Sequence, residues 1–213
     1  MSRELAKEAR RRQLIEATID GIARKGFTEL KIADVAAEAG LSVGIVNFYF
    51  KSKDALLIAT FKHLVEDYEQ HMQAILAKAG KSAAAQLDAM IEADFARTHA
   101  NRKQVTVWYA FWGETRWRPE FLKLCADLST SFQKATTETF QALIDEGGYQ
   151  GLDAGLIARG FNAMIDGLWL DMLLNPKQTD RDTAKASVRA FLAGLFPREF
   201  GSKAAPANGN AAA

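Results

Sequence analysis

Residues 30–54 contain side chains whose types and spacing could read DNA. On the expected outward side of a short helix lie five small, apolar and amide residues: Val43, Gly44, Ile45, Asn47 and Phe48. This side is too apolar for a surface that contacts only water. The amide group of Asn47 suits N6 and N7 of adenine, which are exposed in the major groove. The segment therefore predicts a helix that reads base edges.

Two short helices joined by a glycine turn would position that reading side. Apolar residues recur at helical spacing in the first of them: Ile32, Val35, Ala36 and Ala39. Gly40 then fits a left-handed helix end, and Ser42 can cap the second helix. In that helix, Val46, Tyr49 and Phe50 are expected to face inward. The pattern predicts a helix-turn-helix, although two helices and a glycine turn also occur in ordinary bundles.

Basic residues gather near this segment, although the whole chain is close to neutral. The net charge is +1, whereas ten Lys and Arg against seven acids give residues 1–53 an excess of +3. Arg11 stands near the expected start of the first helix, and Lys51 and Lys53 follow the reading helix. These cations can neutralise phosphates on both sides of a groove. A charge run alone more often marks a solvated face, so it supports DNA binding only together with the helix-turn-helix.

Residues 11–57 resemble the N-terminal domain of the TetR family of transcriptional repressors. The matching residues are Gly26, Phe27, Ile32, Val35, Ala36, Ala39, Gly40, Leu41, Ser42, Gly44, Tyr49, Phe50, Lys53, Leu56 and Leu57. The motifs GIVNFYF (44–50), VWYAFW (107–112) and IDGLWL (165–170) resemble those of choline-responsive members that control glycine betaine synthesis genes. The resemblance implies a ligand-responsive homodimer that binds a double-stranded DNA operator with an inverted repeat.

The chain departs from the family pattern at two positions of the DNA-binding segment. Lys31 stands where Thr usually opens the positioning helix, so the usual side-chain cap is lost, although a lysine can still reach phosphate. Asn47 stands where Tyr is common, which leaves the operator sequence open. We expect DNA contacts from Arg11, Lys31, Ser42, Val43, Gly44, Ile45, Asn47, Phe48, Tyr49 and Lys53.

The rest of the chain shows helical spacing and no strand pattern of useful length. Helices are expected at about 10–25, 53–78, 82–99, 101–112, 119–146, 153–174 and 179–195. The fold class is therefore all-α, with a three-helix DNA-binding module at 1–53 and a helical ligand-binding and dimerisation domain at 54–197. A tail at 198–213 has little apolar bulk and is expected to be disordered.

The chemistry of an enzyme finds little support in this sequence. Its three histidines lack the i, i+4 spacing of a helical zinc site, and no phosphate-binding loop or nucleophile elbow is present. Cys125 alone excludes an intrachain disulfide. We therefore expect no catalysis, no metal and no cofactor. The chain also lacks an apolar run of membrane length and a signal-peptide core, which predicts a cytoplasmic protein.

The tryptophans lie outside the DNA-reading segment and could hold a cationic ligand. Trp108 and Trp112 are four residues apart, with Tyr109 beside Trp112, and Asp166 shares a helix side with Trp169. Rings around a carboxylate suit a quaternary ammonium ion, because it cannot donate hydrogen bonds. Helical aromatic residues more often fill a core, and this stays the alternative. Two other acids could supply the counter-charge: Glu114 and Asp171.

The last two helices are the expected dimer interface, where symmetric pairing would make a four-helix bundle. Its expected residues are Gly160, Met164, Gly167, Val188, Phe191, Leu192 and Leu195. Packing within one chain is the alternative for these residues. For the function, one alternative is a repressor that senses a neutral apolar or drug-like molecule. Another is a helical interaction module without a DNA function.

Overall fold

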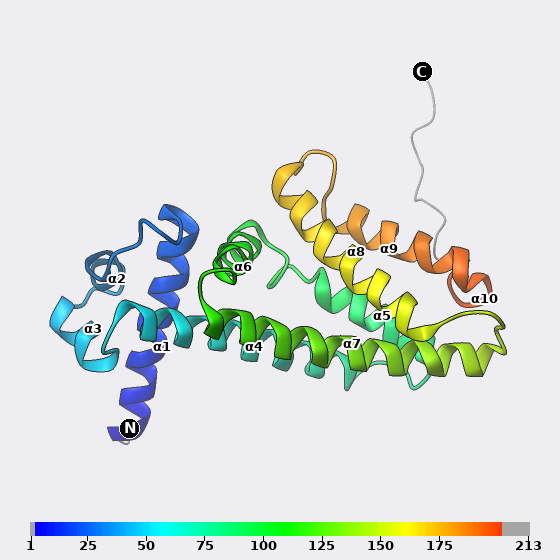
Figure 1. The fold of residues 1–213 in the computed structure, drawn as a ribbon, viewed down its shortest axis with the longest axis horizontal. Coiled ribbons are helices and arrows are strands. Elements are labelled where there is room, and N and C mark those ends of the chain that lie inside the picture. Colours follow the sequence, from blue (N-terminus) through cyan, green and yellow to red (C-terminus); the bar gives the residue numbers. More distant parts are fainter. Residues whose placement is uncertain (1–2, 202–213) are drawn as a thin grey trace. The chain divides into compact units, whose positions relative to one another are not determined.

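The computed structural model describes residues 3–201, and in that range every regular element is a helix (Figure 1). The ten helices are α1 (Arg3–Lys25), α2 (Ile32–Glu38), α3 (Val43–Tyr49), α4 (Lys53–Leu76), α5 (Ala83–Asp94), α6 (Arg102–Glu114), α7 (Pro119–Gly147), α8 (Ala154–Leu174), α9 (Arg181–Leu195) and α10 (Pro197–Phe200). The predicted all-α fold class is confirmed. Within residues 3–201, no single helix is long and apolar enough to span a membrane; α2 and α3 qualify only as a pair bent by 105°.

Most helix ends agree with the spacing of the apolar residues, but two differ. α1 begins at Arg3 instead of about residue 10. Apolar spacing could not indicate the earlier start, because residues 4–13 are exposed and carry no apolar stripe. α5 ends at Asp94 instead of about residue 99, with Phe95 as its C-cap. The side chain of Asn101 donates hydrogen bonds to the carbonyls of Arg97 and Thr98 in the turn that follows.

The chain divides into two compact units. Unit 1 comprises residues 1–70 and 102–129, and unit 2 comprises residues 71–101 and 130–213. Unit 1 therefore contains the first three helices together with α6, which packs against α1. The division does not coincide with the expected boundary between residues 53 and 54, and the functional domains stay a prediction.

Four phenylalanines form the centre of unit 1 and join α4, α6 and α7 to the turn after α1. Phe61 stacks on Phe111 with ring centroids 4.6 Å apart, and Phe27 meets Phe111 edge-on at 5.3 Å. Phe121 contacts the same rings edge-on. All four are buried, and offset or edge-on ring pairs add to the stabilisation from burial.

Arg118 covers this aromatic centre and connects three segments of unit 1. Its guanidinium lies 5.6 Å from the ring centroids of both Phe27 and Phe121. It also pairs with Asp54 at 2.5 Å and with Glu114 at 3.2 Å. The start of α4 is thereby fixed to the turn between α6 and α7.

The core of unit 2 extends into the segment that was expected to be a disordered tail. Residues 198–200 belong to α10, where Phe200 is fully buried, so the prediction is wrong for these three residues. Phe196 and Phe200 are four residues apart and bury one helix side. The ring of Tyr149 lies 4.5 Å from the guanidinium of Arg198 and holds this end of the chain. The remaining tail, 202–213, lies outside the described residues.

Candidate functional site

The helix-turn-helix has the local geometry that its glycine and serine predict. Gly40 adopts φ +64, and the amide of Leu41 donates to the carbonyl of Ala36 at 2.8 Å, which closes the end of α2. Ser42 caps α3 by accepting a hydrogen bond from the amide of Ile45 at 3.3 Å. Both predicted features of the turn are confirmed.

The start of α2 is capped from within the helix, because Lys31 offers no acceptor. Asp34 instead accepts a hydrogen bond from the amide of Lys31 at 2.9 Å. The ammonium of Lys25, 2.6 Å away, is the largest cause of a lowered pKa for Asp34. This capping role of Asp34 was not predicted, although an acid three residues after the N-cap indicates it. The side chain of Lys31 is exposed and takes no part in this cap.

The expected reading side of α3 is exposed, and the opposite side is buried. Val43, Ile45 and Phe48 are 43%, 39% and 77% exposed, and Gly44 and Asn47 are exposed as well. On the other side, Val46 and Phe50 are buried in the core. Tyr49 is half-buried at the boundary between the two sides. The orientation agrees with the prediction, and the contacts of these residues with DNA stay a prediction.

Two cations flank α3 in different ways. The guanidinium of Arg11 is exposed and lies 5.2 Å from the ring centroid of Phe50, the C-cap of α3. Lys53 is half-buried, and its ammonium donates to the carbonyl of Thr28 at 3.4 Å. Lys53 therefore also holds the start of α4 against the turn after α1. Arg11 has no such structural hydrogen bond among the contacts described and is the more accessible of the two.

The three aromatic residues predicted on α6 lie together in unit 1. Trp108 is only 3% exposed, and its ring meets Phe61 and Tyr68 edge-on at 5.6 and 6.0 Å. The ring of Trp112 lies 6.1 Å from that of Trp108 and 4.9 Å from that of Tyr109. Tyr109 and Trp112 are half-buried. Trp108 is thus largely a core residue, whereas Tyr109 and Trp112 keep accessible ring surface.

The other predicted ligand residues lie on α8 in unit 2. Trp169 is buried, and its indole N–H donates to the backbone carbonyl of Asp94 at 3.0 Å. Asp166 keeps solvent-accessible surface, yet desolvation by surrounding protein raises the pKa of its carboxyl to about 6. Asp166 therefore lies at the surface, and nearby protein disfavours the charged form of its carboxyl.

The two reserve acids are already engaged in contacts within the chain. Glu114 pairs with Arg118. Asp171 accepts hydrogen bonds from the amide of Asn175 at 2.6 Å and from the hydroxyl of Thr179, and both lower its pKa, Thr179 first. Neither acid can serve as a counter-charge without loss of one of these contacts.

The expected dimer residues separate into a surface set and a core set. Val188 and Leu192 are fully buried, because the apolar side of α9 packs against α8 and α10, so their assignment to an interface is wrong. Phe191, Leu195 and Met164 are half-buried. The surface of α8 instead carries an exposed stripe at alternating spacings of four and three, with no charge in it: Leu156, Gly160, Ala163, Gly167, Leu170 and Leu174.

Two family models match this chain, one at each end. Residues 14–60 match bacterial regulatory proteins of the tetR family, and residues 83–197 match the BetI-type transcriptional repressor, C-terminal. The chain belongs to the TetR family. It is a transcriptional regulator of BetI type, and this family is not a class of enzymes.

Related proteins match over most of their length. The HTH-type transcriptional regulator BetI 2 of Chromohalobacter salexigens is 33% identical over 86% of both chains. BetI of Escherichia coli is 30% identical over 89% of this chain and 95% of its own. A putative transcriptional regulator from Pseudomonas aeruginosa PAO1 has a similar structure, with a TM-score of 0.79, 28% identity and coverage of 92% and 94%. The resemblance to this family is thus confirmed.

Replacement of Asn47 by Ala should change base preference at one position of each half-site. The lost amide pairing should cost about 1 to 3 kcal/mol on the preferred base and little on the others. The measurement is the affinity for a duplex selected by the protein from a randomised library and for its single-base variants. The exposed amide Gln73 on α4 is a matched control, since Gln73→Ala leaves α3 intact. An unchanged preference in Asn47→Ala would remove Asn47 from the reading side.

Proposed function

We propose that this regulator is a dimeric cytoplasmic repressor of glycine betaine synthesis genes that responds to choline or a closely related quaternary amine. The observation that carries the proposal is the cluster of Trp108, Tyr109 and Trp112, which lies within the segment that matches the BetI-type domain. A putative regulator from Saccharomonospora viridis was solved in complex with choline. It shares the fold, with a TM-score of 0.78, 24% identity and coverage of 85% and 94%.

The chemistry of the α6 cluster suits a quaternary ammonium ion. Such an ion binds ring faces and negative charge, and this preference strengthens where water is excluded. Tyr109 and Trp112 are half-buried and can offer ring surface, whereas Trp108 is buried against Phe61 and Tyr68 and lies beside Trp112. The sequence assigns the counter-charge to Asp166 on α8, and this assignment stays a prediction. A neutral ligand would gain from the rings but not from this carboxylate, and it is the second candidate.

The dimer is proposed to form through the exposed stripe of α8, together with α9. Gly160 and Gly167 sit in this stripe, and a Cβ built on either would meet no atom of the chain within 4 Å. A glycine inside a helix costs about 1 kcal/mol relative to alanine, and the packing of this chain does not explain that cost. Close approach of a second helix does explain it. The three leucines of the stripe would then lose their exposed surface in the same contact.

Control by a ligand would follow from the dimer. Each chain carries one reading helix of seven residues, so firm binding needs two heads at the spacing of an inverted repeat. A ligand weakens DNA binding only when it favours a spacing that the operator does not accept. The proposal therefore predicts that choline and operator DNA oppose one another.

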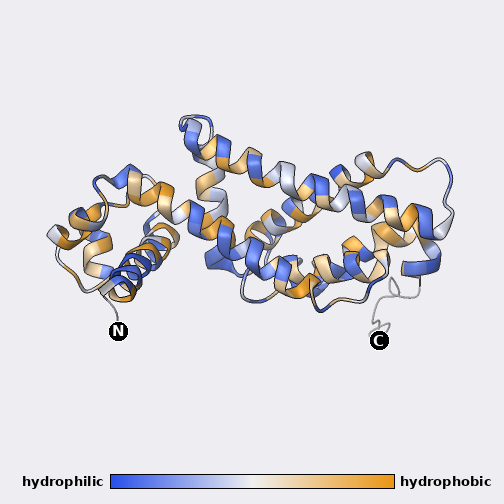
Figure 2. Cartoon of the chain, turned by 90° about the horizontal axis from the view of Figure 1, so that it is seen from below, coloured by the Kyte–Doolittle hydropathy of each residue, from blue (hydrophilic) through white to orange (hydrophobic). Residues whose placement is uncertain are grey.

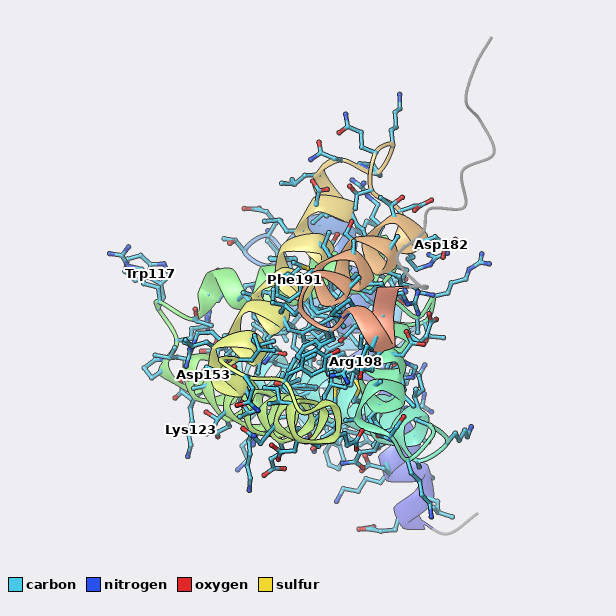
Figure 3. The ribbon with its side chains drawn as sticks, turned by 90° about the vertical axis from the view of Figure 1, so that its right-hand side faces the viewer. Trp117, Lys123, Asp153, Asp182, Phe191 and Arg198 are labelled. Carbon is cyan, nitrogen blue, oxygen red and sulfur yellow. The ribbon has the colours of Figure 1, made fainter. Side chains whose placement is uncertain are left out.

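Replacement of Trp112 by Ala should weaken choline binding by roughly 30-fold. One ring face is lost, and a desolvated contact of this kind contributes about 2 kcal/mol or more. Isothermal titration calorimetry measures the change. Trp117→Ala is the control, because Trp117 is 72% exposed near the cluster in sequence and points away from its ribbon (Figure 3). Absence of heat with unaltered protein at millimolar choline would return Trp112 to a purely structural role.

Choline affinity should fall as the pH falls through about 6, because the carboxyl of Asp166 becomes neutral there. If only the ionised form binds, proton competition weakens binding by about tenfold between pH 7 and pH 5. The Asp166→Asn variant should bind choline weakly at both pH values and lose the dependence. The uncharged isostere 3,3-dimethylbutanol should bind both proteins alike. A pH dependence that persists in Asp166→Asn would assign it to another group.

Replacement of Gly160 by Leu should separate the dimer without unfolding the chain. The space beyond Gly160 is open in one protomer, and leucine favours a helix more than glycine does, so the protomer should not lose stability. Sedimentation velocity should show monomers. Gly113→Leu, at a similarly open position on α6, should stay dimeric. Intact dimers of folded Gly160→Leu protein would place the interface elsewhere.

A further inference from the structure

The start of α1 is an exposed helical arm. The helix begins at Arg3, but its first buried residue is Leu14, and residues 4–13 are all exposed. Hydrophilic residues dominate this part of the helix beside the N mark in Figure 2. Ten residues of α-helix extend about 15 Å. No residue of this extension is buried in the core, so packing within the chain does not explain which residues it contains.

Charge is segregated around the arm. At about 100° per residue, Lys7, Arg10 and Arg11 fall within an arc of roughly 100°. The acids Glu4 and Glu8 follow in the next sector, and Arg12 lies beyond them. The helix therefore has a continuous basic side, which we call the basic side of the arm and define by Lys7, Arg10 and Arg11.

Contacts within unit 1 show which way the basic side faces. Arg11 lies over Phe50 at the end of α3. Arg10 donates to the side chain of Gln13 at 2.7 Å, and Gln13 donates to the carbonyl of Ala39 at 2.7 Å, next to the turn between α2 and α3. Arg11 therefore contacts the helix-turn-helix directly, and Arg10 is linked to it through Gln13.

Arg12 faces a different element. The pKa of Glu16 is lowered first by its hydrogen bond with His63 on α4, and the charge of Arg12 adds to this effect. The pKa of His63 is raised, first by its hydrogen bond with Glu16, and the positive charge of Arg12 acts against this rise. Glu16 contacts α4 and lies four residues after Arg12 on the same side of the helix, so Arg12 lies on the α4 side of α1, away from the basic side of the arm.

We propose that the arm is a second DNA-binding element, in which Lys7, Arg10 and Arg11 bind phosphates beside the base pairs that α3 reads. The proposal rests on DNA binding by α3. Duplex DNA carries one negative charge per about 1.7 Å of its axis, so a basic helix side of this length can meet several phosphates. Contacts of this kind position the protein and carry no base preference.

The test compares two variants of α1, one that removes cations from the basic side of the arm and one that removes a cation from another side of the same helix. Lys7→Gln combined with Arg10→Gln should reduce the magnitude of the slope of log affinity against log salt by about 3.6 for a dimer on both half-sites, because two phosphate contacts are lost from each protomer and each contributes about 0.9. Base preference should not change. Arg12→Gln should leave the slope unaltered. The probe is a duplex that the unaltered protein selects from a randomised library, and fluorescence anisotropy measures its binding over a series of KCl concentrations.

A second measurement locates the contact on the DNA. Removal of base pairs outside the selected sequence should weaken binding of the unaltered protein and lower its salt slope. The Lys7→Gln, Arg10→Gln variant should be insensitive to the same removal. Circular dichroism should show that every variant keeps its helices.

The outcomes separate this proposal from DNA binding itself. If the unaltered protein selects no duplex and retains none at low salt, DNA binding by α3 fails and the arm fails with it. If Asn47→Ala alters base preference while Lys7→Gln, Arg10→Gln keeps the slope, the reading helix stands and the arm is not a DNA-binding element. An equal loss of slope in Arg12→Gln would show that net charge acts without orientation, which also overturns the proposal.

Discussion

The packing of Phe61 against α6 is the contact on which the rest of unit 1 depends. Its ring stacks on Phe111 and meets Trp108 edge-on, so one residue of α4 contacts both the aromatic centre and the proposed effector cluster. Interiors are packed closely enough that a moved ring must displace its neighbours. A ligand that shifts the rings of α6 therefore acts on α4 through a direct contact.

The start of α4 is fixed by polar contacts and lies close to the reading helix along the chain. Lys53 and Asp54 open α4, and they bind the carbonyl of Thr28 and the guanidinium of Arg118, respectively. α3 ends three residues before α4 starts, at the C-cap Phe50. Because only residues 50–52 join the two helices, a rotation of α4 must move α3 or distort this short connection. Small shifts at the effector cluster can thus become a change in the position of the reading side.

Sequence reasoning succeeds where a feature is local. The turn at Gly40, the cap at Ser42 and the exposed side of α3 all follow from residues within one segment, and the structure shows the same arrangement. It fails where a property depends on distant partners. Val188 and Leu192 have the apolar spacing of an interface, and only the fold reveals that α8 and α10 cover them.

Other errors have equally specific causes. The arm of α1 has no apolar stripe, because none of its residues 4–13 is buried, so periodicity could not extend the helix to Arg3. The burial of Phe200 depends on a one-turn helix after Pro197, too short to leave a periodic signal. The raised pKa of Asp166 comes from the density of surrounding protein, which no spacing along the chain expresses. The proposed effector residues could be selected by type, but their accessibility could not.

Two apolar surfaces that the single chain leaves exposed explain why its function needs partners. The reading side exposes Val43, Ile45 and Phe48, and the stripe of α8 exposes Leu156 and Leu174, each without a charged residue among them. A surface of this kind is costly in water and is retained where another molecule covers it. The two surfaces also support each other. A seven-residue reading helix reaches few bases, and the proposed pairing through α8 would link two such helices so that the second binding event becomes intramolecular. Loss of the α8 contact would therefore weaken operator binding even though α3 itself stays unchanged.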